Sequence, residues 1–243
     1  MKQFKKVIIV VILLLYLSGC AHDGQPLTNI QQCITSKQIE IVNSLFFNRK
    51  EANDDYLGEF RFESGLIDLP VVQGIDNDYY LKHAFDQTSD GKGTLFADYR
   101  NTLDDQNIIV YGHLVYYDDQ AMFSPLQILR DEINYADNAF FDLVLEKEIW
   151  RYQIAYVFYY QLYNPKLEYF HPNYFDKLKP YVENLEKNAF YDTGITLNDE
   201  DHFMTLQTCV KYREDLRLIV VAKRVKIINT NEYKLFYLDF NPQ

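Results

Sequence analysis

The stretch MTLQTCVKYREDLRLIVVAKRV, residues 204–225, holds two apolar, β-branched runs separated by a polar segment. This pattern predicts two antiparallel strands, 203–209 and 217–225, joined by the loop VKYREDL. In that arrangement Cys209 and Arg217 face each other across the mouth of the loop. A strand cysteine is often only a small buried hydrophobe, and an arginine near a turn is often only solvated. The pair is therefore a candidate site only if other reactive side chains reach it.

Similar runs occur along most of the chain. Further strands are predicted where β-branched and aromatic residues lie between Gly, Asn, Asp or Pro: LIDLPVVQG, GTLFADYR, QNIIVYGHLV, FFDLVLEKEIWRYQIAYVFYYQLYN and KLFYLDF. Three segments have helical patterns instead: residues 30–50, 124–138 and 172–190. Pro180 marks a start or a kink in the last of these helices. The sequence thus predicts one mainly β domain, a barrel or a sandwich, without internal repeats.

The composition supports a globular domain of this kind. With 243 residues, 48% of them hydrophobic, the chain is long enough to bury a proper core. The 21 Tyr and 17 Phe residues favour aromatic packing between strands. The net charge of -11 argues against nucleic acid as a partner, because phosphate contacts require clustered Lys and Arg.

The N-terminus has the pattern of an export signal. MKQFKK is basic, the apolar run VIIVVILLLYL follows, and LSGC occupies residues 17–20. Residues 17–20 resemble a bacterial lipobox, in which Cys20 would be lipidated and become the mature N-terminus; an uncleaved membrane anchor is the alternative. In both cases residues 1–21 form the signal or anchor, 22–37 a tether, and 38–243 a domain outside the membrane.

A reactive thiol needs a nearby base or cation that favours the thiolate. His113 is the best candidate, because the apolar strand NIIVY ends just before it and strand ends commonly carry functional residues. His202 is excluded, since seven residues of extended strand separate it from Cys209 by roughly 23 Å. The remaining histidines fit the tether, loops or helices: His22, His83 and His171.

Arg217 has two competitors for the role of a cationic partner. Arg213 lies inside the predicted loop, and Arg224 lies seven residues farther along the strand, too far from Cys209. A guanidinium at position 217 could donate to an oxyanion or hold a substrate backbone. A disulfide between Cys33 and Cys209 would silence the thiol, and the sequence leaves that pairing open.

No HExxH motif or clustered Cys and His set predicts a metal or another cofactor. The acidic stretch LNDED, residues 197–201, is interpreted as a solvated face rather than a calcium site.

Several motifs occur in an order that resembles the sortases. TLQTC, residues 205–209, is followed by Arg217 and IVVAKRV and preceded far upstream by IIVYGH; in sortases the motif TLxTC carries the nucleophile. Other segments are similar to class B sortases: LPVVQGIDNDYYL, GTLFADYRN, YGHLVYYDDQAMFSPL and a long helical insertion before HFMTLQTC. The resemblance covers about residues 38–228.

The resemblance implies a sortase-type β-barrel with an N-terminal helix and a long helix inserted before the strand of the catalytic cysteine. It implies that Cys209 is the nucleophile, His113 the general acid and base, and Arg217 the stabiliser of the transition state. It also implies a groove for the sorting signal that is lined by Asn77, Leu81, Tyr111, Gln207 and Thr208.

Three departures from the class B pattern concern specificity and packing. Gln207 stands where these enzymes often have Ser, and Val210 where an acidic residue can follow the cysteine, so the preferred substrate motif is left open. The segment DDYLGEFRFESG, residues 54–65, lacks a tryptophan common near this strand, which suggests altered packing.

The activity implied is transpeptidation without a metal or organic cofactor. The Cys209 thiolate attacks the carbonyl of a Thr in a C-terminal sorting signal, and an amine then resolves the thioacyl enzyme. The implied partners are surface proteins with such a signal and, as acceptor, a peptidoglycan precursor or a pilin lysine. Two other interpretations stay open: a catalytically weak, sortase-like binding lipoprotein, and a cysteine hydrolase in which water replaces the amine.

Overall fold

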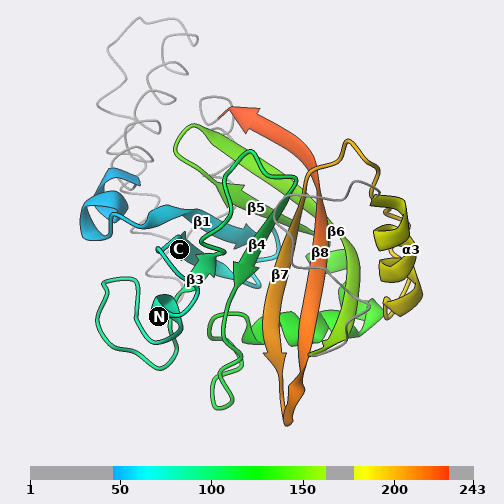
Figure 1. Ribbon diagram of the computed structural model, residues 1–243, viewed down its shortest axis with the longest axis horizontal. Helices are drawn as coiled ribbons and strands as arrows, with labels where there is room; N and C mark the ends of the chain where they lie inside the picture. The colour runs from blue at the N-terminus through cyan, green and yellow to red at the C-terminus, as the bar shows by residue number, and fades with distance from the viewer. Residues whose placement is uncertain (1–45, 163–177, 230–243) are drawn as a thin grey trace, which may run out of the picture. The chain divides into compact units, whose positions relative to one another are not determined.

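The computed structural model describes residues 46–162 and 178–229. Lys50–Ile228 form one compact unit, in which the strands close into a barrel in the order β1-β2-β3-β4-β7-β8-β6-β5 (Figure 1). The strands are β1 Tyr56–Phe62, β2 Asp68–Val72, β3 Leu95–Ala97, β4 Asn107–Tyr111, β5 Phe140–Val144, β6 Glu148–Gln161, β7 Phe203–Val210 and β8 Arg213–Asn229. The predicted mainly β barrel is therefore confirmed.

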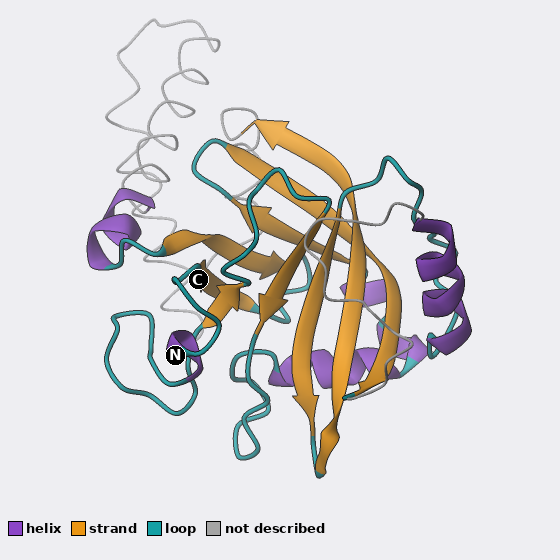
Figure 2. Cartoon of the chain, viewed as in Figure 1, coloured by secondary structure: helices purple, strands orange, loops and turns teal. Residues whose placement is uncertain are grey.

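Short helices connect the strands (Figure 2). They are η1 Tyr79–Leu81, η2 Ser124–Arg130, η3 Glu132–Asn134, η4 Ala136–Asn138 and α3 Leu178–Asn188; residues 46–52 are also helical. The helix predicted at 124–138 consists of three successive 3-10 helices rather than one α-helix. Pro180 lies in the first turn of α3, as expected for a helix start.

Two parallel pairs interrupt an otherwise antiparallel barrel. β2 pairs with β3 and β4 with β7 in parallel, and β1 closes the barrel by pairing with both β2 and β5. Parallel neighbours need a long crossover connection, and the chain from β5 to α3 supplies it between β4 and β7. This pairing places Tyr111 beside Gln207 and so joins the two sequence regions of the predicted site.

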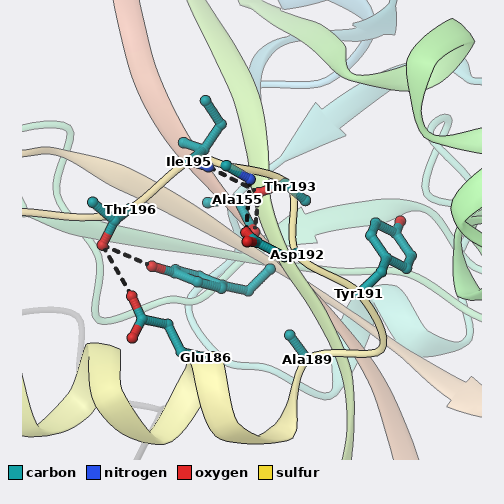
Figure 3. A pocket seen from close by; sticks show the side chains of 10 residues that line it. Ala155, Glu186, Ala189, Tyr191, Asp192, Thr193, Ile195 and Thr196 are labelled. Atoms are coloured by element: carbon teal, nitrogen blue, oxygen red, sulfur yellow. Dashed lines mark hydrogen bonds between the residues drawn. The ribbon is translucent and has the colours of Figure 1, made fainter.

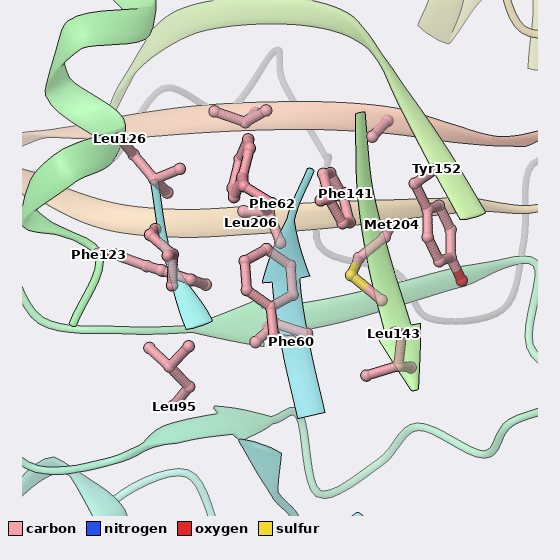
Figure 4. Close-up of a cluster of buried hydrophobic side chains, with 14 of the residues drawn as sticks. Phe60, Phe62, Leu95, Phe123, Leu126, Phe141, Leu143, Tyr152, Met204 and Leu206 are labelled. Carbon is pink, nitrogen blue, oxygen red and sulfur yellow. The ribbon is translucent and has the colours of Figure 1, made fainter. Parts of the chain in front are cut away.

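The barrel interior is filled by aliphatic side chains around a group of aromatic rings (Figure 4). The ring of Phe60 lies 4.8 Å from that of Phe141 and 5.6 Å from that of Phe123, centroid to centroid. Edge-to-face and tilted pairs at these distances add to the stabilisation from buried area. From η2, Leu126 and Leu129 reach the same core with no exposed surface. Phenylalanines thus fill the core at β1, where the sequence lacks the expected tryptophan.

A second apolar cluster lies between α3 and the outer face of the barrel. The helix contributes Tyr181, Val182 and Leu185. The strands contribute Phe158 and Tyr160 of β6, Phe203 of β7, and Ile219 and Val221 of β8. The helix inserted before β7 therefore covers part of the outer face of β6, β8 and β7.

Several predictions lie outside the described residues: the signal or anchor 1–21, the tether 22–37, Cys33, His171, the strand KLFYLDF, most of the N-terminal helix and the domain boundary at 38. Within 46–162 and 178–229, no helix is long and apolar enough to cross a membrane.

Candidate active site

The strand β7 presents Cys209 on the outer face of the barrel. Met204, Leu206 and Val210 belong to the barrel core, and side chains alternate along a strand, so Gln207 and Cys209 point outward. Cys209 is a free, half-buried thiol. A nucleophile here is attached to a rigid strand and open to the outer surface.

The neighbouring strand places Arg217 directly opposite Cys209. Opposite residues in an antiparallel pair share a face, with Cβ atoms about 4.5–5.5 Å apart, so the predicted facing of these residues is confirmed. The predicted loop is wrong, however, because Lys211 and Tyr212 alone form the turn and β8 begins at Arg213. The register jumps at Val210, which pairs with Arg213, so residues 214–216 bulge out of the ladder.

This bulge holds the guanidinium of Arg217. The Nη1 atom donates to the carbonyl oxygens of Glu214 and Leu216, each at 2.9 Å. A guanidinium has five N–H donors. The donors on its other nitrogen atoms do not bind these carbonyls and remain for a ligand on the outer face. The half-buried Arg217 is thus oriented by its own backbone.

The two competing arginines contact other groups. Arg213 forms a two-point ion pair with Asp215, at 3.0 and 2.9 Å. Arg224 lies 4.6 Å from the ring centroid of Trp150, and its backbone N–H bonds the carbonyl of His202, at the end of β7 remote from Cys209.

His113 follows β4 at the level of Cys209. Tyr111 pairs with Gln207, and the N–H of Gly112 donates to the Gln207 carbonyl at 3.1 Å, so the parallel ladder continues past β4. A Cβ on Gly112 would point inward, 2.5–2.6 Å from Leu95 and Phe123. Alternation then directs His113 outward, onto the face that carries Cys209.

The ring of His113 is fixed by the segment around η1. Its Nε2 lies 2.8 Å from the carbonyl oxygen of Leu81. Because a carbonyl only accepts, Nε2 carries the proton and Nδ1 is left as the acceptor nitrogen. Gly93, with φ +67°, packs against this ring, and a Cβ there would lie 2.4 Å from the Tyr80 carbonyl oxygen and 3.2 Å from His113 Cδ2. The close approach requires glycine.

Two other histidines contact other groups. His202 contacts the Asp105 carbonyl at 3.1 Å at the far end of β7, in agreement with its exclusion. His83 stacks on Tyr79 with ring centroids 3.9 Å apart.

A buried carboxylate joins two of the predicted groove residues. Asp98 accepts from Asn77 at 3.0 Å, from the Tyr111 hydroxyl at 2.8 Å, and from Arg100 at 2.6 and 2.8 Å. Burial opposes the charge of Asp98, but the hydrogen bonds from Arg100, Tyr111 and Asn77 prevail and lower its pKa to about 2. Burial, together with the Asp98 charge, raises the pKa of Tyr111. Sequence reasoning missed this aspartate, which comes directly after β3.

The other groove candidates are placed differently. Leu81 packs in a small cluster with Tyr111 and uses its carbonyl to hold His113. Gln207 is half-buried on the outer face beside Tyr111. Thr208 is only 2% exposed and points into the barrel, so a peptide on the outer face would meet its backbone rather than its hydroxyl.

Sequence reasoning also missed Gln127. From η2, its side-chain amide donates to the carbonyl oxygen of Cys209 at 3.1 Å. That carbonyl lies at the step where the β7–β8 register jumps, so Gln127 fixes the backbone of the candidate nucleophile.

Comparisons with known proteins agree with this geometry. The crystal structure of Clostridium perfringens sortase B superposes with a TM-score of 0.67 at 32% identity, over 74% of this chain and 98% of that one. Sortase B of Listeria monocytogenes is 28% identical over 72% of each chain. Sortase B of Staphylococcus aureus is 26% identical over 93% of this chain and 99% of its own.

Two solved complexes, Staphylococcus aureus sortase B with a substrate and a sortase B with triglycine, show the same fold at 22% identity, with TM-scores of 0.68 and 0.67. No family model matches the chain. The closed barrel, with a thiol and a guanidinium paired across β7 and β8, defines a sortase, a cysteine transpeptidase. The chain belongs to the sortase B family.

Proposed function

We propose that this transpeptidase cleaves a C-terminal sorting signal after a threonine and transfers the acyl group to an amine. Cys209 is the nucleophile, His113 the general acid and base, and Arg217 the donor to the oxyanion. One observation carries the assignment: Cys209 and Arg217 are paired on the outer face, with His113 at the same level at the end of β4.

The reaction has two acyl transfers. In the first, the Cys209 thiolate attacks the threonine carbonyl, the peptide bond breaks, and His113 protonates the departing amine. In the second, an acceptor amine attacks the thioester, His113 takes its proton, and the thiolate leaves. Arg217 stabilises the oxyanion of both tetrahedral intermediates, since a guanidinium held by backbone carbonyls needs little reorganisation.

Relatives support both substrates of this scheme. Sortase B has been solved with a substrate and with triglycine, and the second of these ligands carries an amine. We extend this to the present chain as a surface protein with a sorting signal and a peptidoglycan precursor as acceptor; a pilin lysine is the alternative acceptor. Residues 1–21 would hold the enzyme on the outer face of the cell membrane, through an anchor or a lipid on Cys20. Incorporation of labelled fatty acid, lost in Cys20→Ala, would test the lipid.

The test of function uses the solubilised full-length protein. Peptides of the NPxTx and LPxTG types are incubated with triglycine, with a lysine peptide or without acceptor, and mass spectrometry follows the products. We expect an amine adduct and a thioacyl enzyme mass from the wild type, and neither from Cys209→Ala. Hydrolysis without any adduct would instead favour the cysteine hydrolase, and a folded protein that gives no product would favour the binding lipoprotein.

Matched variants separate the proposed roles from general damage. His113→Ala and Arg217→Ala should each lower kcat/KM by at least about a hundredfold, the range for general acid–base groups and oxyanion donors. His202→Ala and Arg224→Ala remove the same residue types at the end of β7 remote from Cys209 and should keep activity near the wild-type level. Equal losses in both pairs would contradict the assignment.

A further inference from the structure

A pocket of about 570 Å³ lies outside the candidate active site (Figure 3). Ala155 and Tyr156 of β6 form its floor, the last turn of α3 contributes Glu186, and the connection that follows, residues 189–196, forms the rest of the wall. This volume is within the range of small-molecule sites, about 300–1,000 Å³.

The wall of the pocket is held by hydrogen bonds that do not involve a ligand. Thr193 donates from its hydroxyl to the Ala155 carbonyl at 2.7 Å, and Tyr191 donates to the Leu129 carbonyl at 2.7 Å. The side chain of Asp192 accepts from the N–H of Gly194 at 2.8 Å, and φ +73° at this glycine permits the tight turn. The pocket is therefore formed in advance.

The polar groups of the pocket are hydroxyls and carboxylates. Tyr156 donates to the Thr196 hydroxyl at 3.1 Å, and Thr196 donates to Glu186 Oε1 at 3.3 Å; Figure 3 shows the contact between Thr196 and Glu186. Asp192 adds a second carboxylate. The ten lining residues include no Lys, Arg or His. At the margin, Lys223 Nζ lies 3.5 Å from the Thr196 carbonyl oxygen and pairs with Asp201 at 2.7 Å, so its charge is already matched by a carboxylate outside the lining.

The electrostatics of Tyr156 agree with this picture. Burial raises the pKa of its hydroxyl, the hydrogen bond with Thr196 opposes this rise, and the charges of Glu186 and Asp192 add to it. Both carboxylates are exposed and both charges act on Tyr156. Within 46–162 and 178–229, no group of three or more His, Cys, Asp or Glu side chains could hold a metal ion.

We infer that this pocket binds a primary ammonium group on an aliphatic stem, as in a lysine side chain. The ammonium donates to Glu186 and the Thr196 hydroxyl, whose oxygens lie 3.3 Å apart, while Asp192 adds a second negative charge to the lining and the methylene groups lie against Ala155, Ala189 and Ile195. The aliphatic chain of such a ligand fits the apolar part of the lining, and its ammonium group fits the carboxylate and hydroxyl acceptors at the margin.

The pocket is separate from the reacting residues. The N–H of Leu162 bonds the Asp215 carbonyl, so in the antiparallel β6–β8 pair Tyr160 is level with Arg217. Tyr156 lies four residues away along β6, roughly 13 Å at 3.3 Å per residue, and β8 lies between β6 and β7. Ligand binding here does not depend on Cys209.

The test is a titration of the isotope-labelled full-length protein with N-acetyl-lysine methylamide, followed by NMR. We expect saturable shifts at the amides of Gly194, Ile195 and Thr196, and none from the norleucine analogue, which has an apolar stem without the ammonium. The double variant Glu186→Gln, Asp192→Asn should bind at least about tenfold more weakly, since it loses a charged acceptor and a second negative charge of the lining.

A second double variant, Asp199→Asn with Glu200→Gln, changes the net charge equally outside the pocket and should bind like the wild type, as should Cys209→Ala. If both double variants bind equally weakly, general charge attraction explains the loss of affinity, and the proposed site is contradicted. Equal shifts from norleucine, or displacement of the lysine derivative by millimolar Mg²⁺, would overturn the ligand class.

Discussion

Asp98 shows how one side chain organises the wall of the proposed groove. A buried carboxylate is costly unless its lone pairs are filled, and here Asn77, Tyr111 and Arg100 fill them. The residue has no exposed surface. Its charge therefore fixes the position of two groove residues that come from separate segments of the chain.

Replacing Asp98 by Asn should destabilise the protein at neutral pH. Its pKa falls from 3.8 to about 2 on folding, so the charged form contributes about 2 kcal/mol of stability above pH 4. This contribution is lost as the pH falls from about 4 to about 2. Urea unfolding at pH 7, 4 and 2.5 should show a lower free energy of unfolding and a flatter acid limb in Asp98→Asn.

Asp215→Asn is the matched control, because Asp215 also pairs with an arginine two residues away, but near the surface. Solvent screens an exposed pair, so its loss should change the free energy of unfolding little. Equal acid sensitivity of the two variants would contradict the role of Asp98.

Thr208 offers the opposite case, a buried polar group without a partner. Its hydroxyl has no hydrogen-bond partner among the described residues, and burying such a group costs free energy. Thr208→Val should therefore raise the free energy of unfolding by about 1 kcal/mol. Thr205→Val is the control, because that hydroxyl donates to Asn107 at 2.8 Å, and its loss should destabilise. Thermal unfolding of both variants tests this prediction. A change in the free energy of unfolding with the same sign in both would contradict it.

The end of β4 is an element whose backbone must approach the core closely. Gly112→Ala would place a Cβ 2.5–2.6 Å from Leu95 and Phe123, and overpacking of this kind costs about 1–3 kcal/mol. Because His113 is the next residue, activity should fall together with stability. Gly91→Ala, where a Cβ meets nothing within 4 Å, should leave both unchanged. Calorimetry and peptide cleavage check the pair; tolerance of Gly112→Ala would show that β4 can shift.

The contact between η2 and β7 should matter for turnover rather than binding. Gln127→Leu removes the donor to the Cys209 carbonyl, a hydrogen bond of about 1 kcal/mol, so kcat should fall about fivefold with KM nearly constant. Gln120→Leu, at an exposed position, serves as the control. A change confined to KM would assign Gln127 to substrate binding instead of positioning.

Local patterns explain which elements could be predicted from the sequence. The β7–β8 pair is continuous in sequence, so apolar runs and a polar turn indicate it, and with it the facing of Cys209 and Arg217. The turn itself was misplaced, because a bulge absorbs residues 214–216 within β8. The roles of Asp98 and Gln127 could not be predicted, because both residues act through contacts with segments distant in sequence. Such contacts leave no pattern in the neighbouring residues.

In the part of the chain that the structure describes, the two larger apolar cores lie inside the barrel and beneath α3, beside a small third cluster around Tyr80. Leu185 is fully buried in the second, and Leu185→Ala should cost about 2–5 kcal/mol. Hydrogen exchange should accelerate at amides of α3 more than at those of β1 and β2, since local openings follow local packing. Lys187→Ala, exposed on the same helix, should change neither. Uniform acceleration across the barrel would mean that the two cores unfold as one.

The parallel pairing of β4 with β7 has a consequence for the time course of folding. The two strands are about a hundred residues apart in sequence, and closing so long a loop is slow compared with forming hairpins such as β7–β8. The thiol and its arginine can thus meet early, while the imidazole joins them only when the crossover is complete. A newly made chain would gain its reactivity in the last stage of folding, after its apolar surfaces are already buried.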